Sequence, residues 1–220
     1  MAQDSEHLTE LLLKSSSIHI IGCGLNKERP ANKAIYDLEH NGWRLIPIHV
    51  KDSGATVNKR PIRPVIDEGI FPEVIVLFLA PERALEFVKQ LIFKFPKDDF
   101  PLIWFQHGAK HDDAVSMLED YGTEFVIDDC IVKYILRNKL SKAPSNQSLP
   151  WYRQTKDRDA AGCSIWEVFD GNTEVDQQNG DLEWVGDILD LEYSKHIIPR
   201  YIRSMLKQSE TLHELALRLS

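Results

Sequence analysis

The sequence is poor in cysteine and contains no long apolar run. Three cysteines, Cys23, Cys130 and Cys163, occur in 220 residues, and no two of them form a Cys-x-x-Cys pair. This spacing favours neither a disulfide framework nor a zinc site, so we expect no metal centre. No stretch approaches the ~18 consecutive apolar residues of a membrane span. The opening Met1-Ala-Gln-Asp-Ser-Glu-His is acidic and polar, unlike a secretory signal, and we expect a cytoplasmic protein.

An excess of positive charge is also missing. The chain has 26 Lys and Arg against 34 Asp and Glu, a formal net charge of -8. This balance disfavours nucleic acid or an anionic membrane as a partner. A small anionic molecule remains compatible with it, because a local cluster of cations can outweigh the mean field inside a cleft.

Apolar runs alternate with amphipathic stretches through the first 140 residues. We expect strands at 18–21, 43–50, 74–79, 102–105 and 124–127, and helices at 6–14, 30–40, 81–93 and 112–121. The loop at 51–64 leads into a possible short helix at 65–68. This alternation is typical of an α/β fold, here a Rossmann-like, doubly wound, mostly parallel five-stranded sheet.

The composition changes after residue 138. A polar segment at 141–148 is typical of a linker, so we divide the chain into a domain at 1–140 and an acidic extension at 141–220. Residues 164–169 suit a strand or a helical turn. Leu182, Val185, Ile188 and Leu189 share a helical face, and Ser209 is a candidate cap for a last helix. We therefore expect a mainly helical extension that packs on the domain or on a second subunit, as in a homodimer.

The most informative stretch runs from Ile18 to Pro30, where a short apolar strand meets two glycines and a polar loop. Gly22 and Gly24 let backbone amides approach a ligand, and a helix that begins at Pro30 directs unpaired amides to the same place. Such a turn suits a phosphate or diphosphate. The NAD fingerprint G-x-G-x-x-G is incomplete, since Lys27 takes the third glycine position and residues 47–50 include no carboxylate. No P-loop Gly-Lys-Ser/Thr follows either.

The run Ile20-Ile-Gly-Cys-Gly-Leu-Asn-Lys-Glu-Arg-Pro30 resembles the opening of the small bacterial and archaeal CoA-binding proteins, whose first loop is similar to G-x-S-x-N-x-x-R-P-S. The resemblance continues at Gly42-Trp-Arg-Leu-Ile-Pro-Ile48, at 74–78, at Trp104-Phe-Gln-His-Gly108 and at Asp129-Cys-Ile131. It extends from about residue 8 to residue 135. It implies a domain akin to the CoA-binding domain of succinyl-CoA synthetase, with coenzyme A or an acyl-CoA held through its ADP and diphosphate part and no established catalytic residues.

The resemblance also implies which residues bind the ligand. They follow the first four strands, as Gly22, Cys23, Gly24, Asn26, Arg29 and Pro30, then His49 and Lys51, then Ala80 and Pro81, then Gln106 and Gly108. Arg29 suits a two-pronged contact with a phosphate, and Lys51 suits a point charge. The chain departs from the family pattern at four places: Gly24 replaces serine, His49-Val50 replaces Asn-Pro, His107 takes a usually apolar position, and Asp129 stands where arginine is common.

Several functions stay open beside a non-catalytic binding or regulatory protein. They are an enzyme that uses CoA, an NAD(P)- or other nucleotide-binding oxidoreductase or redox sensor, and an interaction module with a decayed pocket. Cys23 is either a reactive thiol at a helix N-terminus or a small apolar filler. His107 and His111 suit a general base, but Asp112 and Asp113 can simply cap the next helix.

Overall fold

Short apolar runs form a five-stranded sheet in the order β2-β1-β5-β6-β7. The computed structural model describes residues 5–143, 149–156, 163–176 and 181–220. The strands are β1 (Ser17–Ile21), β2 (Arg44–Ile48), β5 (Val74–Leu77), β6 (Leu102–Phe105) and β7 (Phe125–Val126). β1, β5 and β6 are buried along their whole length, as parallel strands covered on both faces must be. β1, β5, β6 and β7 pair in parallel, which confirms the predicted α/β class.

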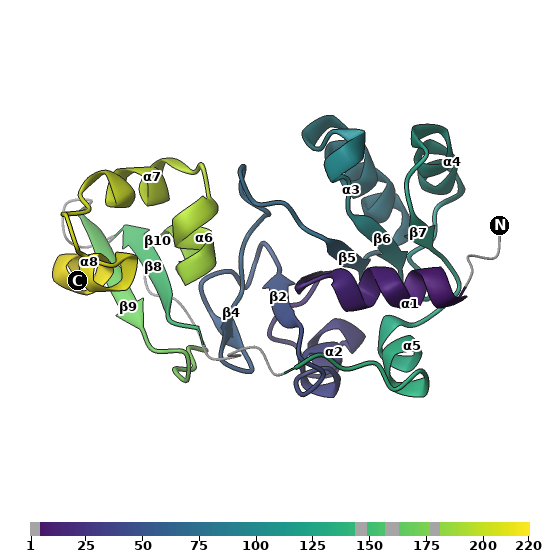
Figure 1. The fold of residues 1–220 in the computed structure, drawn as a ribbon, viewed down its shortest axis with the longest axis horizontal. Helices are drawn as coiled ribbons and strands as arrows, with labels where there is room; N and C mark the ends of the chain where they lie inside the picture. The colour runs from purple at the N-terminus through teal and green to yellow at the C-terminus, as the bar shows by residue number, and fades with distance from the viewer. Residues whose placement is uncertain (1–4, 144–148, 157–162, 177–180) are drawn as a thin grey trace. The chain divides into compact units, whose positions relative to one another are not determined.

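Helices cover both faces of this sheet. They are α1 (Ser5–Lys14), α2 (Pro30–Asp37), α3 (Pro81–Lys94), α4 (Asp112–Tyr121) and α5 (Ile131–Arg137), with a short 3-10 helix η1 (Lys97–Asp99). Figure 1 shows α3 and α4 on one face and α1, α2 and α5 on the other. Pro30 and Pro81 stand at the first helical positions, and Gly122 ends α4 with a φ of 71°. α2 ends three residues before the predicted His40, and α5 was not predicted.

The strand order locates the point where the sheet changes direction. The chain moves outward from β1 to β2, then crosses back to β5 on the other side of β1. In open α/β sheets of this order, ligands bind beyond the carboxyl ends of the strands at this switch point. The turns that follow β1 and β5 therefore lie where a ligand is expected.

The C-terminal residues form a second sheet with its own helices. β8 (Trp151–Lys156), β9 (Ser164–Phe169) and β10 (Asp181–Asp187) pair in the antiparallel order β10-β8-β9, and α6 (Ile188–Tyr193), α7 (Ile197–Ser204) and α8 (Leu212–Leu219) follow. Tyr152, Trp184 and Leu191 belong to the core that joins strands and helices. The expectation of a mainly helical extension missed these strands. Of the residues assigned to one helical face, Leu182 and Val185 lie in β10, whereas Ile188 and Leu189 do lie in a helix, α6.

A single register shift explains that error. β10 carries an irregularity between Leu182 and Trp184, so its apolar residues lose the strict alternation that marks a strand. The cap of the last helix was also misplaced. The side chain of Thr211, not that of Ser209, accepts from the amide of Glu214. The side chain of Glu214 accepts from the amide of Thr211, which completes a capping box.

The chain divides into two compact units. Over their described parts, one comprises residues 1–23, 27–46 and 71–145, and the other comprises residues 24–26, 47–70 and 146–220. The loop after β2 thus folds with the C-terminal strands. It forms a small hairpin of β3 (Thr56–Val57) and β4 (Arg60–Pro61), and the helix expected at 65–68 is absent there. Most of the predicted linker at 141–148 lies outside the described residues.

Buried polar contacts explain why that loop belongs with the C-terminal unit. Arg63, 7% exposed in its side chain, donates through Nε to Asp190 at 2.9 Å and through a terminal nitrogen to Asp187 at 2.8 Å. Trp184 donates its indole N–H to Asp67 at 2.9 Å. Buried charges need such partners, so these contacts tie the loop to α6 and β10.

Candidate functional site

The turn after β1 requires glycine at its first position. Gly22 has a φ of 91°, and a Cβ there would lie 2.5 Å from the carbonyl oxygen of Phe78. Phe78 in turn donates its amide to the carbonyl of Ile21 at 3.0 Å. The chain segments that follow β1 and β5 therefore meet at the switch point, and no larger residue fits between them.

The second glycine of the turn makes room for a carboxylate. A Cβ on Gly24 would lie 2.1 Å from Oδ2 of Asp52 and 2.8 Å from Nδ1 of His49. The Leu25 amide donates to the same Asp52 oxygen at 2.8 Å, and His49 Nδ1 lies 3.1 Å from that oxygen. Asp52 was not among the predicted site residues. Its position, four residues beyond the end of β2, was the available signal.

The helices that open after β1 and β5 leave their first amides without side-chain caps. Arg29 and Ala80 hold the cap positions of α2 and α3, both with extended backbones, and neither side chain accepts a capping hydrogen bond. By contrast, His111 caps α4 through Nδ1, which accepts from the amide of Asp113. This contact gives His111 a structural role, and Asp112 and Asp113 are not the cap that was expected. Uncapped N-terminal amides at the switch point suit an anion.

Two of the predicted site residues, Arg29 and Lys51, are exposed cations. The side chain of Arg29 makes no hydrogen bond or ion pair with any residue that the structure describes, and Lys51 is likewise exposed. Asn26 is exposed as well, whereas Cys23 is fully buried between the two glycines. Burial gives Cys23 the position of a small packing residue. The side chain of Arg29 can therefore meet an anionic ligand without first breaking a partner contact.

The end of β6 holds a buried donor that lacks an acceptor. Gln106 is 6% exposed, and its Nε2 has no hydrogen-bond partner among the described residues. Its backbone is fixed, since Ala109 donates to its carbonyl at 2.8 Å. Gly108 follows with a φ of 81° and open space where a Cβ would stand. A buried amide left unpaired is costly, which makes this position a candidate ligand contact.

At the end of β7, Asp129 has a local partner. Two nitrogens of Arg137 contact its carboxylate, one at 2.9 Å, and the Cys130 amide donates to Oδ1 at 2.8 Å. These bonds, led by the one from Arg137, hold the pKa of Asp129 below its ordinary value. The acidic residue that departs from the family pattern is therefore paired with an arginine of α5.

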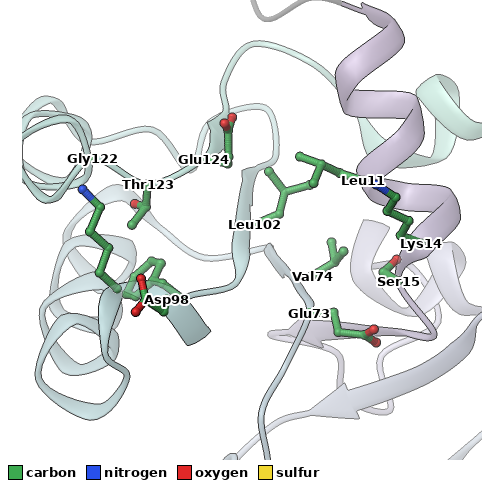
Figure 2. A pocket seen from close by; sticks show the side chains of 12 residues that line it. Leu11, Lys14, Ser15, Glu73, Val74, Asp98, Leu102, Gly122, Thr123 and Glu124 are labelled. Atoms are coloured by element: carbon green, nitrogen blue, oxygen red, sulfur yellow. The ribbon is translucent and has the colours of Figure 1, made fainter.

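A hollow lies at the opposite edge of the sheet. It measures about 390 Å³ and is lined by the residues that precede β1, β5, β6 and β7, among them Ser15, Glu73 and Glu124. Figure 2 shows Leu11, Val74 and Leu102 between these polar groups. Glu73 already accepts from the amides of Ser16 and Ser17, at 2.8 and 2.9 Å. The hollow contains none of the predicted site residues.

The described part of the chain contains neither a cluster of metal ligands nor a membrane-spanning helix. There, no three His, Cys, Asp or Glu residues gather closely enough to hold a metal ion. No helix in the same residues has the length and apolar character needed to cross a bilayer.

The fold and its glycine turn define a doubly wound nucleotide-binding type of domain. The CoA binding domain family matches residues 16–135, more than half of the chain, and the protein belongs to that family. β8–β10 and α6–α8 lie outside the match. Of the predicted site residues, all twelve fall within it.

Part of the chain is also similar to individual proteins. YneT, an uncharacterized protein of Bacillus subtilis, is 24% identical over 125 residues, which are 56% of this chain and 88% of the relative. A hypothetical protein from Pyrococcus horikoshii is 25% identical with a TM-score of 0.54, over 62% of this chain and 92% of its own. Prb, the PH1109 protein redesigned for binding, is 25% identical with a TM-score of 0.55, over 66% of this chain and 98% of its own.

Proposed function

We propose that the protein binds coenzyme A, or an acyl-CoA, through the ADP and diphosphate part, as a non-catalytic binding or regulatory protein. The observation that carries this proposal is Gln106, a buried amide donor without an acceptor at the end of β6. In a member of the CoA binding domain family, a bound ligand is the natural acceptor. The donor would be desolvated in the free protein and satisfied in the complex.

The chemistry of the neighbouring groups suits an anion with several phosphates. The amides of the turn at 22–26 and the uncapped first turns of α2 and α3 are donors. Arg29 would grip a phosphate with two N–H groups, and Lys51 would add a point charge near the adenosine end, beside His49. Ala80, Pro81 and Gly108 would allow close approach of the ligand to the backbone. None of these groups would contact the thioester of a bound acyl-CoA.

Asp52 favours one other candidate, a nicotinamide dinucleotide. A carboxylate in the loop after the second strand, next to the glycine turn, is the group that such sites use to hold the adenosine ribose. For such a ligand, Asp52 would supply the carboxylate that residues 47–50 lack. A dinucleotide would use its unphosphorylated ribose hydroxyls as donors to this acid.

A ligand panel tests the proposal. We expect CoA and acetyl-CoA to raise the melting temperature, since a ligand at about 100 Kd adds ~2.7 kcal/mol of stability, and we expect NAD and ATP to have smaller effects. Stabilisation by NAD with no effect of CoA would reject CoA as the ligand.

The role of Arg29 is tested separately by titration calorimetry. Arg29→Ala should weaken CoA binding by about 1.5–3 kcal/mol through the loss of a charged hydrogen bond. Arg200→Ala, which removes an exposed arginine from α7, is the matched control and should leave the affinity unchanged. Equal affinities of Arg29→Ala and the wild type would remove Arg29 from the site.

A further inference from the structure

One backbone amide of the turn after β1, that of Leu25, already has an anionic acceptor. Leu25 donates its N–H to Oδ2 of Asp52 at 2.8 Å. This oxygen fits there because Gly24 has no Cβ, which would otherwise occupy the same space. His49 Nδ1 lies 3.1 Å from the same oxygen. The chain thus places its own carboxylate on the glycine turn.

A ligand phosphate and this carboxylate cannot occupy the turn together. Both are acceptors, and an amide N–H directed at one is not directed at the other. Two negative charges within a few ångströms also repel, and partial exposure of Asp52 screens this repulsion only in part. Any diphosphate bound here must first break the bond between Asp52 and Leu25.

The segment that carries Asp52 has an exposed middle between two buried ends. Ile48 and Ser53 are buried on either side of it, with exposed fractions of 4% and 6%. Between them, Val50 is 72% exposed and Lys51 is exposed as well. The backbone of the segment is nevertheless bonded, since His49 donates its amide to the carbonyl of Arg63 at 3.0 Å and Asp52 donates its amide to Nδ1 of His49 at 3.3 Å. The carboxylate of Asp52 can therefore leave the turn by rotation of its own side chain while the backbone stays in place.

We propose that Asp52 is an internal competitor for the anion-binding turn, and that ligand binding requires the Asp52 carboxylate to leave it. This inference rests on the proposed function, because it assumes that the diphosphate binds to the turn at 22–26. It adds a residue, Asp52, that lowers the affinity of the site for its ligand. Asp52 would hold the turn ordered in the free protein and release it to a ligand.

The substitution Asp52→Asn tests the proposal by the sign of its effect. Asparagine keeps an acceptor of nearly the same shape and removes the charge. We expect the Kd for CoA, dephospho-CoA and ADP, measured by calorimetry, to fall about tenfold. Asp120→Asn, the same charge change at an exposed position of α4, is the matched control and should leave all three Kd values unchanged.

The opposite result has an equally definite meaning. Unchanged or weaker binding by Asp52→Asn overturns the proposal, and a loss confined to ligands with free ribose hydroxyls would make Asp52 a ligand contact. Asp52→Ala, checked for an intact melting transition, gives a second variant in which the competitor is removed altogether and the same gain is expected.

The panel also separates this proposal from the proposed function. If the wild type binds CoA and neither Asp52 variant gains affinity, only the competitor is wrong. If neither the wild type nor the variants bind any of the three probes, the proposed function fails and the competitor falls with it. Binding that appears only in the Asp52 variants supports both.

Discussion

The buried amide of Gln106 allows a prediction in which stability and binding change in opposite directions. Its Nε2 has no partner among the described residues, and 94% of the residue is removed from solvent, the complement of its 6% exposure. Gln106→Met keeps the length of the side chain and removes both polar atoms. The backbone bonds of this position, from Gln106 to Leu77 and from Ala109 to Gln106, do not involve the side chain and remain.

The magnitude follows from the cost of an unsatisfied buried donor, about 1–3 kcal/mol. Without ligand, Gln106→Met should therefore be more stable than the wild type by about 1–2 kcal/mol. For a chain of this length that corresponds to a rise in melting temperature of about 2–8 °C. CoA affinity should fall roughly tenfold or more, because the ligand loses a hydrogen bond to a charged or polar atom.

Melting curves with and without CoA, together with calorimetry, measure both effects. The matched control is Gln154→Met, since Gln154 Nε2 already donates to Glu183 at 2.8 Å. There the same substitution should destabilise the protein by about 1 kcal/mol and leave CoA affinity unchanged. A Gln106→Met protein that melts at or below the wild-type temperature would refute the claim that the Gln106 amide is a desolvated, unpaired donor in the free protein. Unchanged CoA affinity would refute its contact with the ligand.

Two further predictions concern the turn after β1 and the C-terminal helices. In urea unfolding, Gly22→Ala should destabilise the protein by about 1–3 kcal/mol more than Gly108→Ala. Both positions have a positive φ, but only at Gly22 would a Cβ meet the carbonyl of Phe78. Equal losses of unfolding free energy in the two variants would contradict this clash. The hydrogen bond from Arg218 lowers the pKa of Glu210 from its ordinary 4.5 to about 2, so the pair adds stability above pH 4.5 that is lost as the pH falls towards 2. Arg218→Ala should return that pKa towards 4.5 in a carboxyl NMR titration, and an unmoved pKa would exclude the pair as its cause.

Much of the α/β domain was predictable because its signals are local. Strands such as β5 and β6 are uninterrupted apolar runs, since helices cover both of their faces. Pro30 and Pro81 mark helix starts because proline lacks the amide that a first turn leaves unpaired. The extension was harder. The irregularity in β10 hides its alternation, so four apolar residues at helical spacing were assigned to a helix that does not form over 181–187.

The candidate site was predictable only where it follows the ends of strands. Gly22, Ala80 and Gln106 each come directly after a predicted strand, and parallel strands bring such positions to one edge. Asp52 was missed because only a turn of the chain, which the sequence does not reveal, brings it back to Leu25. His111 was considered as a base, and its bond to the next helix became visible only in three dimensions.

The amino-acid sequence by itself determined the alternation of the main strands and helices between residues 6 and 127, the glycine turn and the family, because apolar periodicity, proline and glycine act on neighbouring residues. Tertiary structure alone decided that Arg63 would be buried against Asp187 and Asp190, more than a hundred residues away, and that Asp52 would accept from the turn after β1. In the unfolded chain these charged groups are hydrated and have no fixed partner. Folding removes the water around them, and the packing of the chain then determines which groups pair.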